Sequence, residues 1–243
     1  MPVASSSQRM RLASHVRACH SDAQVILLDM RRNKYLGVSG ATSNALADQV
    51  EGWPRHSGRT DASATFASVT ALTQRLAAQG ILTNTPWEPL PDSKIEEATS
   101  SLDFEHAGTD SGVGVRRLGL FVRSAAVAAL WMRCRTLHSI AKAVAARRER
   151  LQDSVADCGS LEAMRAGTAA YERLRPFAFT AQDRCLHDSL ALVGFLASEG
   201  VSPRWVIGVK TRPFGAHSWV QHGGIVLNDQ HENVRRYSPI LVV

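Results

Sequence analysis

Residues 185–229 read CLHDSLALVGFLASEGVSPRWVIGVKTRPFGAHSWVQHGGIVLND, with a cysteine, a histidine and an aspartate in that order. These residues are Cys185, His217 and Asp229. A thiol hydrolase needs a nucleophile, a base that takes its proton and an acid that orients the base, and these three side chains are of the right types. We therefore predict that this stretch contains the active site.

A helix is expected to begin close to Cys185. The range 180–183 resembles a capping box with Asp in the fourth place, and apolar residues recur at helical spacing over 186–197 until Gly200 stops the run. Cys185 therefore lies in the first turns of the helix. There the unpaired backbone N–H groups and the positive end of the helix dipole favour a thiolate over a thiol.

Three strands are expected after this helix, over 204–209, 216–221 and 225–229, and Gly223-Gly224 indicates a hairpin between the last two. The length of the hairpin loop decides whether His217 and Asp229 share a face. A three-residue loop over 222–224 sets them directly opposite each other. A two-residue loop instead sets Ser218 opposite Asp229 and turns the acid away.

We predict the three-residue loop, because in that register Asp229 holds the ring of His217 in the tautomer that accepts the thiol proton. Each residue also has an ordinary structural interpretation. A cysteine near a helix start is commonly a small core residue, and a single strand histidine is equally unremarkable. The conjunction of all three in positions that a hairpin brings together favours a catalytic site.

Four segments carry a family resemblance: 183–192 (DRCLHDSLAL), 206–209 (VIGV), 212–220 (RPFGAHSWV) and 226–229 (VLND). Together they resemble the lasso-peptide biosynthesis B protein, a leader peptidase of transglutaminase-like, papain-like fold. In that family the matching residues form the catalytic triad. The resemblance therefore assigns this triad to Cys185, His217 and Asp229.

The resemblance implies a cysteine peptidase that cleaves the leader from a ribosomally made precursor peptide during lasso-peptide maturation. The backbone N–H of Cys185 is an expected oxyanion donor, and Gln182 is the candidate for a second one. An asparagine-synthetase-like cyclase, which joins the freed amine of the core to an acidic side chain, is the implied partner. ATP belongs with that cyclase, so no cofactor is expected for this chain.

The 243 residues are 44% hydrophobic and carry a net charge of +6, enough apolar content for a proper core. We predict an α+β protein with a recognition domain over 1–84, a linker over 85–114 and a peptidase domain over 115–243. The linker is rich in Pro, Ser, Asp, Glu and Gly, and its portion 95–100 could form a short helix.

The chain has no uninterrupted apolar run of about 18 residues, and no signal peptide is recognised at its start, so we expect a cytoplasmic protein without a membrane partner. Its cysteines show neither a CxxC pair nor metal-ligand spacing. We expect free thiols and no metal site. The four cysteines are Cys19, Cys134, Cys158 and Cys185.

The N-terminal part is expected to form three strands and two helices. Runs rich in β-forming residues over 25–29 and 34–38 surround a turn, with a further strand over 10–18, and helices are expected over 41–53 and from Ser63 to Gly80. This order is winged-helix-like. It is similar, more loosely than the C-terminal part, to the pyrroloquinoline quinone peptide chaperone, with KYLG at 34–37 as its best local feature.

That similarity implies that the leader of the precursor adds as a strand to the edge of this sheet. Strand addition uses backbone groups that any edge offers, and apolar pockets add selectivity. The implied leader-binding residues are Lys34, Tyr35, Leu36 and Val38. Two alternatives remain, an edge blunted by its charges and a winged helix that binds DNA. We expect no nucleic acid partner, because the basic residues do not cluster on the second helix.

The range 115–150 contains nine Lys or Arg and one acid, with an apolar stripe that predicts one long or two shorter helices. Such a basic helix either attracts an acidic peptide or partner enzyme, or presents a solvated face, and we favour the solvated face. A further helix is expected over 158–175, ended by Pro176.

Two other functions compete with leader cleavage. The same triad on a transglutaminase-like fold could act as an amidase or acyltransferase, whose product would retain full peptide length. A non-catalytic peptide chaperone would be insensitive to loss of Cys185. The intact triad disfavours the chaperone, and the N-terminal domain disfavours the amidase.

Overall fold

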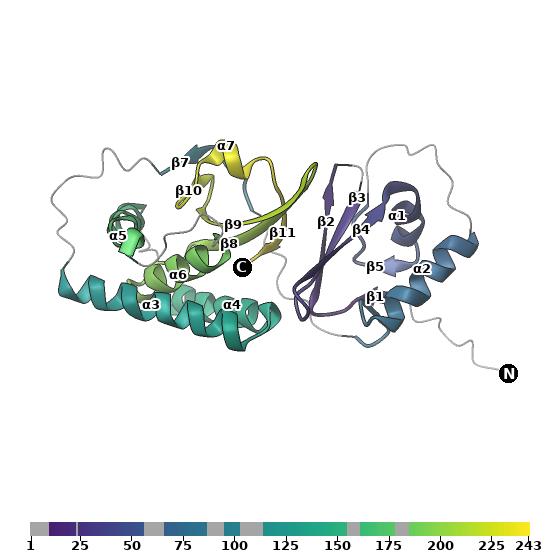
Figure 1. Cartoon of the computed structure of the whole chain (residues 1–243), viewed down its shortest axis with the longest axis horizontal. Helices are drawn as coiled ribbons and strands as arrows, with labels where there is room; N and C mark the ends of the chain where they lie inside the picture. The colour runs from purple at the N-terminus through teal and green to yellow at the C-terminus, as the bar shows by residue number, and fades with distance from the viewer. Residues whose placement is uncertain are drawn as a thin grey trace. The chain divides into compact units, whose positions relative to one another are not determined.

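The computed structural model describes residues 10–22, 24–55, 66–86, 95–102, 114–154, 161–177 and 185–243. The chain divides into two compact units, residues 1–91 and 92–243 (Figure 1). Both contain strands and helices, so the protein is α+β as predicted.

The described residues of the first unit form two three-stranded sheets and two helices. One sheet has the order β5-β1-β6, and the other is antiparallel with the order β2-β3-β4. The elements are β1 (Met10–Leu12), β2 (Val16–Ser21), β3 (Gln24–Asp29), β4 (Lys34–Ser39), α1 (Gly40–Ala47), β5 (Val50–Glu51), α2 (Phe66–Ala78) and β6 (Leu82–Thr83). Val25, Leu27, Leu46 and Ile81 are almost fully buried between these elements and form the core of the unit.

The expected hairpin around residues 31–33 is present, with Asp29 paired to Lys34 across it. The buried Asp29 carboxylate accepts hydrogen bonds from the backbone N–H groups of Arg31 and Arg32, which closes the turn. The helix expected over 41–53 is wrong in its second half. It ends at Ala47, and the chain continues into β5.

The second unit is a five-stranded sheet covered by helices, with the strand order β11-β8-β9-β10-β7 (Figure 1). Its strands are β7 (Ser100–Ser101), β8 (Arg204–Thr211), β9 (Phe214–His222), β10 (Ile225–Val226) and β11 (Ser238–Val242). Its helices are α3 (Val115–Cys134), α4 (Leu137–Ser154), α5 (Leu161–Leu174), α6 (Cys185–Ser198) and α7 (His231–Val234). Helix α6 packs on β8 and β9, and α3, α4 and α5 pack on α6.

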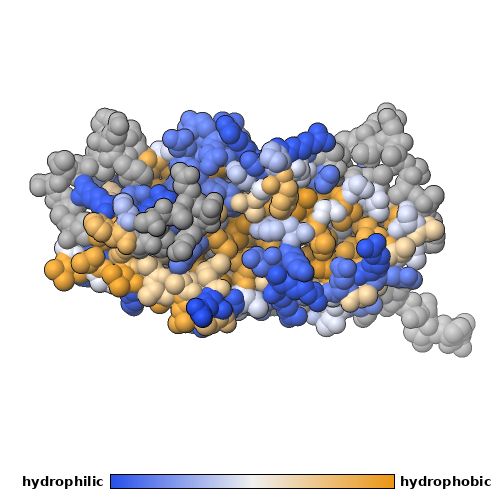
Figure 2. Space-filling view, in the orientation of Figure 1, coloured by the Kyte–Doolittle hydropathy of each residue, from blue (hydrophilic) through white to orange (hydrophobic). Residues whose placement is uncertain are grey.

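The basic range 115–150 forms two helices, α3 and α4, rather than one. Helix α3 carries many apolar residues besides its arginines, and Figure 2 shows apolar residues gathered over it. Phe121 and Ala128 are buried, whereas Leu118, Val122 and Leu130 are exposed. Pro176 follows α5 in a short 3₁₀ turn, which agrees with the expected end of that helix.

Residues 95–102, which the sequence assigns to the linker, take part in the second unit. The short helix expected over 95–100 is wrong, because residues 95–99 form no regular element and Ser100 begins β7. β7 pairs in parallel with β10, Ser100 opposite Ile225 and Ser101 opposite Val226. Backbone N–H groups of Thr99 and Leu102 donate to carbonyls of Gly224 and Val226 and extend this pairing. The edge strand of this sheet therefore comes from residues that the sequence assigns to the linker.

The register predicted for the β9–β10 hairpin is also wrong. The structure pairs Ile225 with His222 and Val226 with Gln221, which is the register of a two-residue loop over Gly223-Gly224. A three-residue loop would have paired Gln221 with Ile225. A continued ladder in the observed register would set Asp229 opposite Ser218, the arrangement that turns the acid away from His217.

Asn228 ends the ladder before that can happen. Leu227 N–H donates to the Val220 carbonyl at 2.9 Å, so a regular pair would return a bond from Val220 N–H to the Leu227 carbonyl. Instead the Val220 N–H donates to Oδ1 of Asn228 at 2.8 Å. The side-chain oxygen replaces the backbone oxygen, and the chain bends over residues 227–229 instead of continuing as a strand.

The contact between α6 and the sheet is fixed by a buried group of hydrogen bonds. The hydroxyls of Ser189 on α6 and Ser218 on β9 lie 2.7 Å apart. The indole N–H of Trp205 on β8 lies 3.0 Å from each of them. All three residues are buried, so these polar groups satisfy one another between elements that are otherwise packed by apolar contacts.

We predict that Asn228→Ala lowers the free energy of unfolding by about 1–3 kcal/mol, because the Val220 N–H loses its acceptor in a part-buried position. Chemical denaturation monitored by fluorescence checks this. Gln230→Ala is the matched control, since Gln230 is an exposed neighbour, and it should change the free energy by less than about 0.5 kcal/mol. Equal effects of the two substitutions would contradict the role given to Asn228.

Candidate active site

Cys185 is the first residue of α6, as the sequence predicts. Its thiol accepts hydrogen bonds from the backbone N–H groups of Leu186, in its own helix, and Ser218, on β9. The thiol also hydrogen-bonds to the side chain of His217. The sulfur therefore lies at a helix N-terminus and against the strand that carries the histidine.

His217 and Asp229 lie against each other in spite of the unexpected register. Nε2 of His217 and Oδ2 of Asp229 form a short hydrogen bond. Because Asp229 occupies Nε2, the other ring nitrogen, Nδ1, is left for the Cys185 thiol. The structure thus brings together all three residues that the sequence singled out, in the order thiol, imidazole, carboxylate.

The carboxylate is itself held in place by the residues that follow it. Oδ1 of Asp229 accepts from the backbone N–H of Gln230 at 2.7 Å, and Nδ2 of Asn233 on α7 lies 3.2 and 3.3 Å from its two oxygens. Burial would raise the pKa of Asp229, but these donors and His217 hold that pKa below its usual range. Asp229 is therefore ionised beside the ring.

Two aromatic rings confine the imidazole. Trp219, two residues along β9, stacks with the His217 ring at a centroid distance of 6.1 Å, and the Tyr237 ring lies 5.3 Å away. The side chain of His217 is only 18% exposed. The ring is therefore limited in the orientations it can adopt.

The pKa values of the thiol and imidazole move in opposite directions. Burial alone would raise the pKa of Cys185, but hydrogen bonds from His217 and from the backbone of Ser218 bring it below its ordinary value. Burial alone would lower the pKa of His217, but Asp229 and Cys185 raise it to about 9. These directions favour a thiolate beside an imidazolium, the reactive form of a cysteine nucleophile.

A second buried carboxylate, Asp188, supports the site from one turn below Cys185. Tyr171 donates to its Oδ1 at 2.9 Å, and Arg175 forms an ion pair with its Oδ2 at 3.0 Å. The Asn228 side chain also hydrogen-bonds to it. Asp188 thereby connects the first turn of α6 to the bend that positions Asp229.

Sequence reasoning missed both Asp188 and Asn228. The available signal for Asp188 was an acidic residue inside an otherwise apolar helical run, which is costly to bury without partners. Nothing in the sequence distinguished Asn228 from a residue on the outward face of a strand. The structure gives its side chain two polar partners, the backbone N–H of Val220 and the Asp188 carboxylate.

The other candidate residues are less informative. Gln182, the expected second oxyanion donor, and the expected capping box lie outside the described residues, as does Cys158. Cys19, Cys134 and Cys185, the cysteines within the described residues, form no disulfide. Within the described ranges, no group of three or more His, Cys, Asp or Glu side chains could hold a metal ion. In the same part of the chain, no helix is both long and apolar enough to cross a membrane.

The four residues expected to bind the leader lie on β4, at one edge of the sheet β2-β3-β4. Among the described strands, β4 pairs only with β3, so its other side is not occupied by a strand of the chain. Val38 is buried and Leu36 packs on the core of the first unit, whereas Tyr35 is half-buried and Lys34 is exposed.

Residues 115–242 match the family model of the transglutaminase-like superfamily. The chain belongs to this superfamily. The matched range covers the helices α3 to α6 and the strands β8 to β11, and it includes Cys185, His217 and Asp229. Strand β7 lies outside it, although it completes the sheet of the transglutaminase-like unit.

Over a short stretch the chain is also similar to a curated protein, the Microcin J25-processing protein McjB of Escherichia coli. The two are 51% identical over 45 residues, which are 18% of this chain and 22% of McjB. The alignment thus spans about a fifth of the length of McjB. No solved structure matches the chain significantly.

We predict that Cys185 reacts with iodoacetamide at lower pH than an unperturbed thiol, and that His217→Ala moves its profile to higher pH. The substitution removes the side-chain hydrogen bond and the positive charge that lower the pKa of Cys185, while burial continues to raise it. Mass spectrometry of the alkylated peptides measures each cysteine separately. Cys134, exposed at the end of α3, is the internal control and should react alike in both proteins. An unchanged Cys185 profile would exclude the thiol–imidazole interaction.

Proposed function

We infer that this protein is a cysteine peptidase that cleaves the leader from a precursor peptide during lasso-peptide maturation. The observation that carries the proposal is the hydrogen-bonded series from the Cys185 thiol through His217 to Asp229 at the start of α6. The local similarity to McjB, a microcin-processing protein by name, supports this function. Membership of the transglutaminase-like superfamily alone would leave the substrate open.

The geometry supports the following mechanism. The Cys185 thiolate attacks the scissile carbonyl carbon, and the backbone N–H of Cys185, which has no acceptor within its helix, donates to the developing oxyanion. The His217 imidazolium gives its proton to the departing amine as the carbon–nitrogen bond breaks. A thioester to Cys185 remains. Neutral His217 then accepts a proton from water, which attacks the thioester, releases the leader as a carboxylate and regenerates the thiolate.

Asp229 keeps the imidazolium stable during this cycle. Its carboxylate raises the pKa of His217, and an amide in its place could neither carry the charge nor enforce the same tautomer. The cleavage rate is therefore expected to fall at alkaline pH as His217 loses its proton, which gives the alkaline limb of the pH–rate profile. Since Asp229 raises this pKa, Asp229→Asn should move the limb toward neutral pH.

Recognition of the leader is proposed for the first unit, at the edge strand β4. The leader would add as a further strand beside Lys34, Tyr35, Leu36 and Val38, using backbone hydrogen bonds for affinity. Binding there raises the local concentration of the cleavage junction at Cys185. The proposed partners are the precursor peptide and the asparagine-synthetase-like cyclase that uses the freed amine.

We predict that Cys185→Ala abolishes leader cleavage and leaves leader affinity unchanged, because no other group replaces the attacking sulfur and the proposed binding strand lies in the other unit. Mass spectrometry of the precursor after incubation measures cleavage, and fluorescence anisotropy of labelled leader measures binding. Two fragments from the wild-type protein support a peptidase. A modified product of full length would instead support the amidase or acyltransferase, and cleavage by the variant would exclude the thiol mechanism.

Strand addition is tested separately with two leader peptides that are N-methylated at alternate residues, one set odd and the other even. Only one set of N–H groups can face the edge of β4, so one peptide should lose most of its affinity and the other should keep it. Anisotropy titrations on the full-length protein give both values. If both peptides bind like the unmodified leader, recognition does not use the strand edge, whatever the outcome of the cleavage test.

A further inference from the structure

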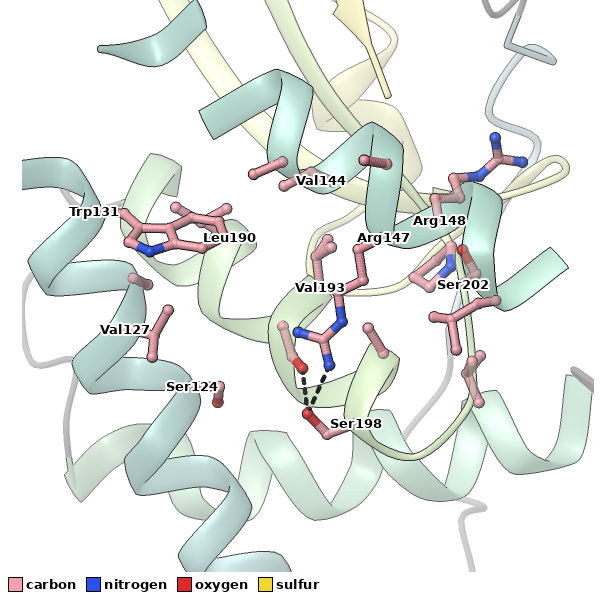
Figure 3. A pocket seen from close by; sticks show the side chains of 18 of the residues that line it. Ser124, Val127, Trp131, Val144, Arg147, Arg148, Leu190, Val193, Ser198 and Ser202 are labelled. Atoms are coloured by element: carbon pink, nitrogen blue, oxygen red, sulfur yellow. Dashed lines mark hydrogen bonds between the residues drawn. The ribbon is translucent and has the colours of Figure 1, made fainter. Parts of the chain in front are cut away.

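A cavity of about 530 Å³ lies between α3, α4 and α6 of the second unit (Figure 3). This volume falls in the range of ligand-binding cavities. The part of α6 that lines it includes Leu190, Val193 and Ser198, whereas Ser189 faces β9 from another side of the helix. Neither Cys185 nor His217 lines the cavity. It is therefore distinct from the candidate active site.

The wall of the cavity is mainly apolar. Each of the three helices contributes to it: Val127 and Trp131 from α3, Val144 from α4, and Leu190 and Val193 from α6. Figure 3 shows the Trp131 ring beside Leu190 at one end of the cavity, and Arg147 next to Val193 with its guanidinium directed toward Ser198. Val127 is 38% exposed, so this wall is open to the surface along α3.

Two guanidinium groups converge at the polar end. Nη2 of Arg123 on α3 and Nη2 of Arg147 on α4 both donate to Oγ of Ser198, at 2.8 and 3.0 Å. Burial lowers the pKa of Arg147, and the nearby charge of Arg123 lowers it further. In the described part of the chain, no carboxylate forms an ion pair with either arginine. Two like charges thus share one neutral hydroxyl.

The C-terminus of α6 compensates only part of this charge. Ser198 is the last residue of the helix, where the dipole amounts to roughly half a negative charge. Two guanidinium groups carry four times that amount. The remaining positive charge lies at the edge of an apolar cavity. A ligand with an anionic group beside an apolar group could pair the anion with the arginines and bury the apolar group in the cavity.

The number of arginines indicates a peptide rather than a single small anion. Arg148 and Arg150 also line the cavity. Arg148 points away from Arg147 in Figure 3, and its Nε is buried without a hydrogen-bond partner. One small anion reaches only one pair of these groups, whereas several carboxylates along a peptide reach more of them.

We propose that this cavity binds an acidic segment of a partner protein, with an apolar side chain of the segment inside the cavity and a carboxylate between Arg123 and Arg147. The site is separate from the β4 edge and from Cys185, and it does not depend on peptidase activity. The basic range 115–150 then acts in binding through these residues, and is not only the solvated face that the sequence favoured.

The test uses a short fluorescein-labelled peptide in which leucines alternate with glutamates, titrated against the full-length protein by anisotropy. Arg123→Gln and Arg147→Gln should each weaken its binding about tenfold or more, because each removes one partner of a shielded charge pair. Arg133→Gln is the matched control, since Arg133 is exposed on α3 and does not line the cavity. It should change the affinity by less than about twofold.

The apolar part of the site is tested with Val127→Trp, which puts a large side chain into the cavity while leaving both arginines in the sequence, and should abolish peptide binding in a protein that unfolds at the same temperature. The same peptide with glutamine in place of glutamate should not bind. An effect of Arg133→Gln equal to that of Arg147→Gln, or binding of the glutamine peptide, would overturn the proposal. So would binding of decanoate without binding of the glutamate peptide, which would indicate a small amphiphile instead. Because no turnover is measured, an inactive peptidase leaves this test intact.

Discussion

The second unit depends on holding one end of α6 against the middle of β9. The thiol comes from the helix and the imidazole from the strand, and a hydrogen bond between them tolerates only small displacements. Apolar packing alone allows sliding, since apolar contacts have no direction. Ser189 lies one turn from Cys185, and Ser218 is next to His217. The directional hydrogen bond between their hydroxyls fixes how α6 sits along β9.

Asp229 is brought to the His217 ring by a bend in the chain and not by strand pairing. It lies on a bend, and the bend exists because the Asn228 carboxamide substitutes for a backbone carbonyl at the last rung of the ladder. The same side chain contacts Asp188, so the acid of the site and the start of the helix share one buried polar network. Such a network is strong when every member is satisfied and weak when one is removed.

Much of the site could be predicted from the sequence, because helical spacing after Cys185 and β-rich runs around His217 are local patterns. The position of Asp229 could not, since the two-residue loop alone would turn it away from His217, and it is the Asn228 side-chain oxygen that ends the ladder first. The place of residues 95–102 was equally hidden, because a two-residue strand has no periodicity. The cavity beside Arg147 could not be predicted either, because it forms only where α3, α4 and α6 pack together. The sequence of each helix alone indicates only a basic or an apolar surface.

The pairing of β7 with β10 has a consequence for synthesis. Residues 100 and 101 leave the ribosome long before their partners at 225 and 226, so this edge of the sheet stays open until those partners have also been translated. The first unit is contiguous over residues 1–91 and has no such delay. It can fold while the helices of the second unit are still being made, whereas Cys185 meets its partners only after His217 and Asp229 have been translated.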